Sequence, residues 1–121
     1  MTENQSIMIK YSIVLVPFPF DDFSAFKVRP AICLTSEIGH FEHVIIAFIS
    51  SNLKTKIEKS DILLYKNKKF AEGTGLAVDS VIKMHRLVTI PKKLIKRKLG
   101  EAKYELIQKI QLQLKSLFEI E

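Results

Sequence analysis

The sequence predicts a mainly β protein, a small barrel or sandwich followed by one C-terminal helix. Short apolar runs rich in Val and Ile alternate with turn residues from Ser12 to Ile90, which is typical of closely spaced strands. After Gly100 the apolar side chains recur at helical spacing instead. The length of 121 residues fits one domain. We therefore expect a single domain over residues 1–121, with its core at about 11–118.

Each expected strand ends at a residue that interrupts regular pairing. Pro17 and Pro19 close the first run, because proline fixes φ and lacks a backbone donor. Gly39 marks the turn before the third run, and Gly73 and Gly75 break the chain before the fifth. The expected strands are residues 12–16, 30–35, 43–50, 61–65, 79–84 and 86–90. Residues 1–10 have weak apolar content, which predicts a loose lead-in.

The last part of the chain changes period. Pro91 closes the final strand and can open one helical turn through Leu94. A helix is expected from Glu101 to about Phe118. Its apolar stripe consists of Tyr104, Ile107, Ile110, Leu114, Leu117 and Phe118. Such a stripe would pack over an open end or edge of the sheet.

Composition limits the partners and the compartment. The net charge of +6 favours an anionic partner such as nucleic acid, although lysines that only keep the chain soluble explain it equally well. No apolar run approaches the length that crosses a bilayer, and the N-terminus lacks the layout of a signal peptide. The single Cys33 lies in an apolar run and is expected to be a buried small hydrophobe. We expect a cytoplasmic protein without a membrane role.

Several kinds of chemistry lack their motifs. The sequence has no glycine-rich phosphate loop, and one cysteine with three scattered histidines does not form a zinc site. Asp21 and Asp22 are adjacent but favour a turn over a magnesium site. An enzyme of this sequence is therefore expected to need no metal and no cofactor. Cleavage of RNA is one such reaction, because the substrate supplies its own 2′-hydroxyl and a guanidinium can stabilise the phosphorane.

Three collinear segments resemble the MazF/PemK family of type II toxin–antitoxin systems. They are residues 13–20 leading to Lys27-Val28-Arg29-Pro30-Ala31, residues 47–51, and residues 79–82 leading through 87–90 to Leu99-Gly100. The resemblance implies an SH3-like barrel with a C-terminal helix. It also implies a homodimeric toxin that binds single-stranded RNA in a groove across the dimer and cleaves it at short sequences without metal. A cognate acidic antitoxin is the implied protein partner.

The resemblance assigns the catalytic roles to two residues. Arg29 matches the arginine of the family's Arg-Pro motif, and Pro30 biases it toward an extended backbone. The alternative is a surface arginine paired with Asp21 or Asp22. Ser50 aligns with the hydroxyl residue that ends the family's third strand and could donate to a phosphate oxygen. The alternative is a serine hydrogen-bonded to the backbone at a strand end.

Five further residues are candidates for substrate binding. Ser24 lies in the loop that frames the substrate in the family, and Lys27 could contact phosphate or could be a solvated loop residue. Ser51 replaces Ser50 if the register is one residue off. Ser80 is expected to line the groove, and Asp79 could orient a base or Arg29. The basic run at residues 92–98 could bind RNA, but we expect a solvated face.

The sequence departs from the family pattern near its start. Tyr11-Ser12 stands where many members have Gly-Asp, and the first loop carries neither His nor Glu. The acid–base group is therefore open between Asp21, Asp22 and Arg29 alone. Two other functions remain: a toxin that binds a protein, as the gyrase-poisoning CcdB toxins do, or a degenerate relative that only binds nucleic acid or antitoxin.

Overall fold

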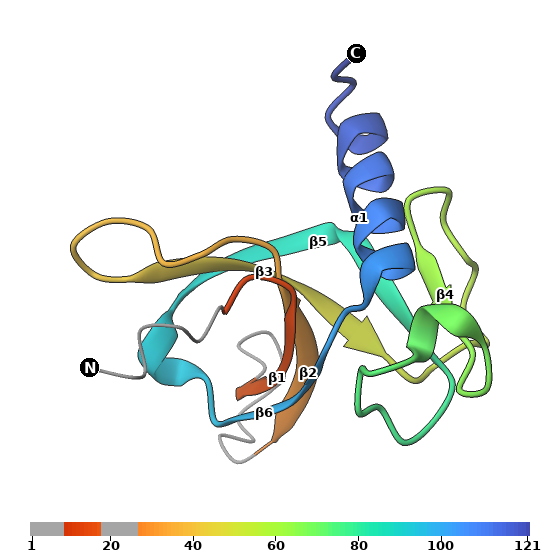
Figure 1. The fold of residues 1–121 in the computed structure, drawn as a ribbon, viewed down its shortest axis with the longest axis horizontal. Coiled ribbons are helices and arrows are strands. Elements are labelled where there is room, and N and C mark those ends of the chain that lie inside the picture. The colour runs from red at the N-terminus through yellow and green to blue at the C-terminus, as the bar shows by residue number, and fades with distance from the viewer. Residues whose placement is uncertain (1–8, 18–26) are drawn as a thin grey trace.

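The computed structural model describes residues 9–17 and 27–121, which form one mixed-length antiparallel sheet and one α-helix (Figure 1). The strands are β1 (Ser12–Pro17), β2 (Val28–Cys33), β3 (His43–Ser50), β4 (Ile62–Leu64), β5 (Ser80–Pro91) and β6 (Arg97–Glu101). The helix is α1 (Tyr104–Leu117), and two short 3-10 turns are η2 (Lys69–Ala71) and η3 (Lys92–Leu94). The fold is therefore a mainly β half-barrel with one C-terminal helix, as the sequence predicts.

The sheet has the strand order β4-β5-β3-β2-β1-β6, so β4 and β6 are its edges, and it is strongly curved (Figure 1). The segment that follows η2 lies directly against β6. The Glu101 backbone N–H donates to the Gly73 carbonyl at 2.8 Å. A Cβ atom at Gly75 would overlap the Leu99 backbone, and one at Gly100 would overlap the backbone of Gly73 and Thr74. These glycines allow two backbones to approach more closely than side chains permit.

Buried side chains fill both faces of the sheet because successive residues of a strand point to opposite sides. One cluster joins the sheet to α1, where Leu106 and Ile110 are fully buried and lie one helical turn apart. The second cluster fills the opposite face and contains Val14, Val16, Ala31, Cys33, Val44, Ile46, Phe48 and Ile90. No helix in the described part of the chain is long and apolar enough to cross a membrane.

Most predicted elements are confirmed, and three differ. Residues 79–84 and 86–90 form one strand, β5, with an irregularity: Ile49 pairs with Ile82, but Ala47 pairs with Leu87. Residues 83–86 of β5 lie between these two pairs. The polar His85 among them suggests a break between two strands in the sequence. Strand β6 was not predicted, because an edge strand that pairs through its backbone needs few apolar side chains. The expected turn after Pro91 is η3, and α1 begins at Tyr104 instead of residue 101.

Candidate functional site

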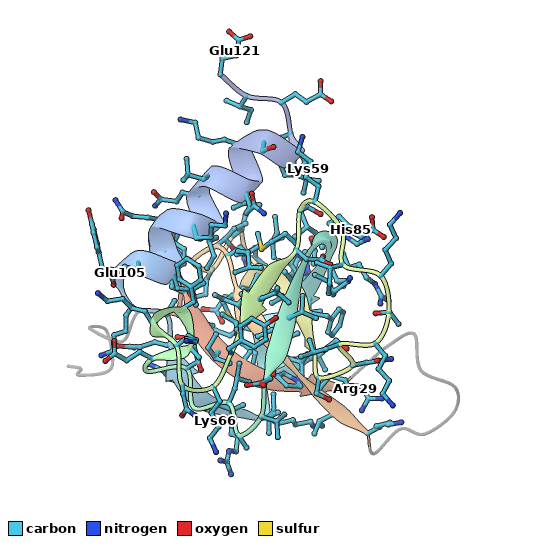
Figure 2. All side chains as sticks on the ribbon, turned by 90° about the vertical axis from the view of Figure 1, so that its right-hand side faces the viewer. Arg29, Lys59, Lys66, His85, Glu105 and Glu121 are labelled. Carbon is cyan, nitrogen blue, oxygen red and sulfur yellow. The ribbon has the colours of Figure 1, made fainter. Side chains whose placement is uncertain are left out.

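A cleft of about 790 Å³ lies where β2 begins and β3 ends. The strand register explains which residues meet there. Ala31 of β2 pairs with Phe48 of β3 in antiparallel fashion, so Arg29, two residues before Ala31, and Ser50, two residues after Phe48, lie at the same end of the two strands. Both residues line the cleft and are half-buried. Figure 2 shows Arg29 at the end of the sheet that is remote from α1.

The lining of the cleft combines positive charge with apolar surface. Its cations are Arg29 from β2, Lys83 and Arg86 from β5, and Arg97 from β6. Its apolar residues are Val28, Pro30, Phe48, Ile49, Leu76, Ala77, Val78 and Leu99. Guanidinium and ammonium groups bind phosphate oxygens, and apolar surface accepts the faces of unstacked bases. The cleft is therefore chemically suited to a single-stranded nucleic acid.

The Ser50 hydroxyl accepts a hydrogen bond from the nearby backbone and still has its own O–H to donate. Its Oγ accepts a hydrogen bond from the Asn52 backbone N–H at 3.0 Å. A serine hydroxyl that accepts one bond keeps its own O–H to donate. The bond fixes the position of the Ser50 oxygen at the end of β3, so the backbone-bonded alternative and a phosphate contact are compatible in this geometry.

The remaining predicted residues divide into two groups. Ser51 and Ser80 line the cleft. Ser51 is exposed, whereas Ser80 is buried and donates its O–H to the Val78 carbonyl at 2.9 Å, so it holds the loop that forms one side of the cleft. Lys27 and Asp79 do not belong to the lining. The Asp79 carboxylate accepts a hydrogen bond from the Lys66 backbone N–H at 2.6 Å, which commits it to the turn after β4.

Three residues expected to act in the first loop, Ser24, Asp21 and Asp22, lie outside the described residues. The structure adds four polar lining residues that were not candidate site residues: Asn52, Lys83, Arg86 and Arg97. Arg97 belongs to the basic run that was expected to be a solvated face. Arg97 and its neighbour Lys98 are both exposed, as expected of a solvated face; Lys98 pairs with Glu101 at 3.0 Å, whereas Arg97 also lines the cleft. Successive residues of a strand point to opposite faces, so the side chains of Arg97 and Lys98 lie on different sides of β6.

Cys33 has no part in the cleft. It is a buried free thiol on β2, as the sequence predicts. Burial, and to a lesser extent the charge of Glu37, raises the pKa of the Cys33 thiol to about 12. The thiol therefore stays protonated at neutral pH and packs as a small apolar group. Within residues 9–17 and 27–121, no three His, Cys, Asp or Glu side chains gather as a metal site would require.

Comparison with solved structures finds the same fold in bacterial toxins. The Mycobacterium tuberculosis toxin MazF-mt6 superposes with a TM-score of 0.68 at 20% identity, covering 91% of this chain and 98% of that one. An endoribonuclease in complex with its cognate antitoxin from a mycobacterial species gives 0.68 at 11% identity, covering 95% and 98%. MazE–MazF from Deinococcus radiodurans gives 0.64 at 15% identity, covering 93% and 95%.

Comparison of the sequence itself gives the family. No curated protein sequence matches the chain significantly. The sequence model of the PemK-like, MazF-like toxins of type II toxin–antitoxin systems matches residues 10–118. That range includes every strand, the helix and all residues that line the cleft. The chain therefore belongs to the PemK-like, MazF-like family of type II toxin–antitoxin toxins.

Proposed function

We propose that this toxin is an endoribonuclease that cuts single-stranded RNA in the cleft around Arg29. One observation carries the proposal: adjacent strands bring Arg29 and Ser50 to one end of the sheet, in a cleft with three further cations. A guanidinium and a hydroxyl donor at that position suit a phosphate that gains negative charge. The fold shared with a mycobacterial endoribonuclease is consistent with this chemistry.

In the proposed reaction the 2′-oxygen of the substrate attacks the adjacent phosphorus. The 2′-hydroxyl loses its proton, a dianionic phosphorane forms, and the bond to the 5′-oxygen breaks as that oxygen gains a proton. Arg29 stabilises the phosphorane through two N–H donors, and the Ser50 hydroxyl donates to a non-bridging oxygen. The nucleophile comes from the substrate and the compensating charge from Arg29, so the reaction as proposed uses no metal and no cofactor.

We propose two further partners. An acidic antitoxin would occupy the same cleft, since its carboxylates complement Arg29, Lys83, Arg86 and Arg97. The MazE–MazF complex of Deinococcus radiodurans has the same toxin fold and supports an antitoxin partner. The antitoxin and the RNA would both meet the toxin in the cytoplasm.

The second partner is another copy of this chain. Large apolar side chains on and after α1 are exposed in the single chain, and covering them would favour a homodimer; they are Tyr104, Leu112, Phe118 and Ile120. Light scattering tests the homodimer. A monomer at micromolar concentration would contradict the homodimer.

The cleavage proposal is tested with purified protein and a long single-stranded RNA in EDTA. We expect cleavage at discrete sites, a loss of about a hundredfold or more in Arg29→Ala, and a smaller loss in Ser50→Ala. Lys98→Ala is the matched control, because Lys98 also lies on the surface of the sheet but outside the cleft. Intact RNA at high concentrations of the wild-type protein would contradict the proposal and favour a toxin that only binds its target.

A further inference from the structure

An ion pair joins the edge strand to the cleft. The Lys83 ammonium donates to the Asp61 carboxylate at 2.7 Å. The Lys83 side chain is 13% exposed and that of Asp61 is fully buried. Ile62 of β4 pairs with Ile82 of β5, so the antiparallel register places Asp61 and Lys83 opposite each other on neighbouring strands. Lys83 lines the cleft, whereas Asp61 does not belong to its lining.

The hydrogen bonds around the pair leave N–H donors of Lys83 available to the cleft. The Asp61 carboxylate also accepts the Glu58 backbone N–H at 2.8 Å, through the same oxygen that binds Lys83. Its other oxygen is buried and has no hydrogen-bond partner among the described residues. An ammonium has three N–H donors, and within the described chain Asp61 is the partner of the Lys83 ammonium. The remaining donors are therefore available to an anion in the cleft.

A buried ion pair of this kind contributes little to the net stability of the fold. Removing two charges from water costs several kcal/mol, and apolar side chains of similar volume often stabilise as well or better. Lys83 would also be flexible if it were unpaired, because a lysine side chain has many rotamers. Asp61 holds that side chain in one place at the expense of one unsatisfied oxygen. The arrangement therefore favours a positioned cation over a structural contact.

We propose that Lys83 binds an RNA phosphate next to the scissile one, and that Asp61 is the residue that positions it. The inference rests on the proposed ribonuclease function. Ser50 pairs with Val81, and Lys83 lies two residues farther along β5 on the same face. Two residues of a strand span about 6.6 Å. Lys83 is thus one step along the cleft from Ser50, where the neighbouring nucleotide of a bound strand would lie.

The direction in which Asp61→Asn changes the affinity for RNA separates two explanations. Asp61→Asn removes one negative charge and so raises by one the net charge of a protein that is already at +6. If total charge alone governed RNA binding, this variant would bind more tightly. If Asp61 acts by holding Lys83, the variant binds more weakly despite its extra charge.

The test measures binding without cleavage. The probe is a fluorescein-labelled 12-nucleotide RNA of mixed sequence in which every 2′-hydroxyl is methylated, so that it lacks the nucleophile. Fluorescence anisotropy gives its Kd for wild type, Lys83→Met and Asp61→Asn at several KCl concentrations. Lys98→Met is the matched control, since Lys98 is also ion-paired, with Glu101 at 3.0 Å, but is 44% exposed and outside the cleft.

We expect Lys83→Met to weaken binding about tenfold and to lower the slope of log Kd against log salt by about one. Asp61→Asn should weaken binding about threefold, and Lys98→Met should change it less than twofold. Equal Kd values for Lys83→Met and Lys98→Met would overturn the role of Lys83. Tighter binding by Asp61→Asn would overturn the role of Asp61.

Two further measurements keep the inference separate from folding and from the proposed function. Thermal unfolding identifies a variant that does not fold, and Lys83→Gln, which keeps a hydrogen-bond donor for Asp61, then replaces Lys83→Met with the same expected tenfold loss. Wild type that cuts RNA while both Lys83 variants bind the probe normally would refute this inference alone. Wild type that neither cuts RNA nor binds the probe would refute the proposed function itself.

Discussion

The close approach of the segment after η2 to strand β6 depends on Gly75, and replacement of Gly75 by alanine measures that dependence. Gly75 and Gly39 both have φ +74°. A Cβ atom at Gly39 meets nothing within 4 Å, whereas one at Gly75 would overlap the backbone of Leu99. The left-handed conformation alone costs alanine about 1–2 kcal/mol, and forcing an atom into a packed backbone costs a further 1–3 kcal/mol or so.

Urea denaturation followed by circular dichroism compares the two variants at equal protein concentration. Gly39→Ala should lose about 1–2 kcal/mol of unfolding free energy, and Gly75→Ala about 2–5 kcal/mol. The difference isolates the close approach, because both positions share the same φ. Equal losses at the two positions would refute a tight contact between the segment after η2 and strand β6.

Three further predictions concern the core, a thiol and an ion pair. Leu106→Ala should lower the unfolding free energy by about 2–5 kcal/mol in the same denaturation assay, because Leu106 is fully buried between α1 and the sheet; a loss below about 1 kcal/mol would contradict that packing. Cys33, whose pKa is raised to about 12, should not react with a thiol reagent at pH 8 until urea unfolds the protein, and rapid reaction of the native protein would show the burial to be wrong. The hydrogen bond from Lys92 lowers the pKa of Glu37 below its ordinary value of 4.5. This pair therefore stabilises the fold above that value and loses its effect as the pH falls through the lowered pKa. Glu37→Gln should lose less than about 1 kcal/mol at pH 7, since both side chains are partly exposed, and the gap to wild type should close in acid; a gap that widens in acid would contradict the sign.

The fold was predictable where burial leaves a pattern in the sequence. The apolar run at residues 43–50 coincides with β3, because this central strand is covered on both faces. Strand β6 left no such pattern, since Arg97, Lys98 and Glu101 are exposed and its pairing with β1 uses backbone groups. Edge strands of this kind are determined by the neighbour that offers free backbone donors and acceptors, which a single sequence does not reveal.

The candidate site was predictable only as far as local motifs reach. Arg29 and Ser50 stand in segments with a recognisable pattern, and the antiparallel pairing of β2 and β3 places both at the same end of the sheet. Lys83 and Arg97 enter the same cleft from β5 and β6, far away in the sequence. Their positions depend on an irregularity within β5 and on the curvature that brings β6 around. Long-range register of this kind has no local signal.

The most direct test is the cleavage of two short RNAs that differ by one oxygen. A cleavage site is first mapped in a long RNA, and an oligonucleotide that contains it is then made with either a 2′-hydroxyl or a 2′-deoxy sugar before the scissile phosphate. We predict that wild type in EDTA cuts only the first, and that Arg29→Ala cuts neither. Cleavage of the 2′-deoxy oligonucleotide, or undiminished cleavage by Arg29→Ala, would contradict attack by the substrate's own hydroxyl in a cleft governed by Arg29.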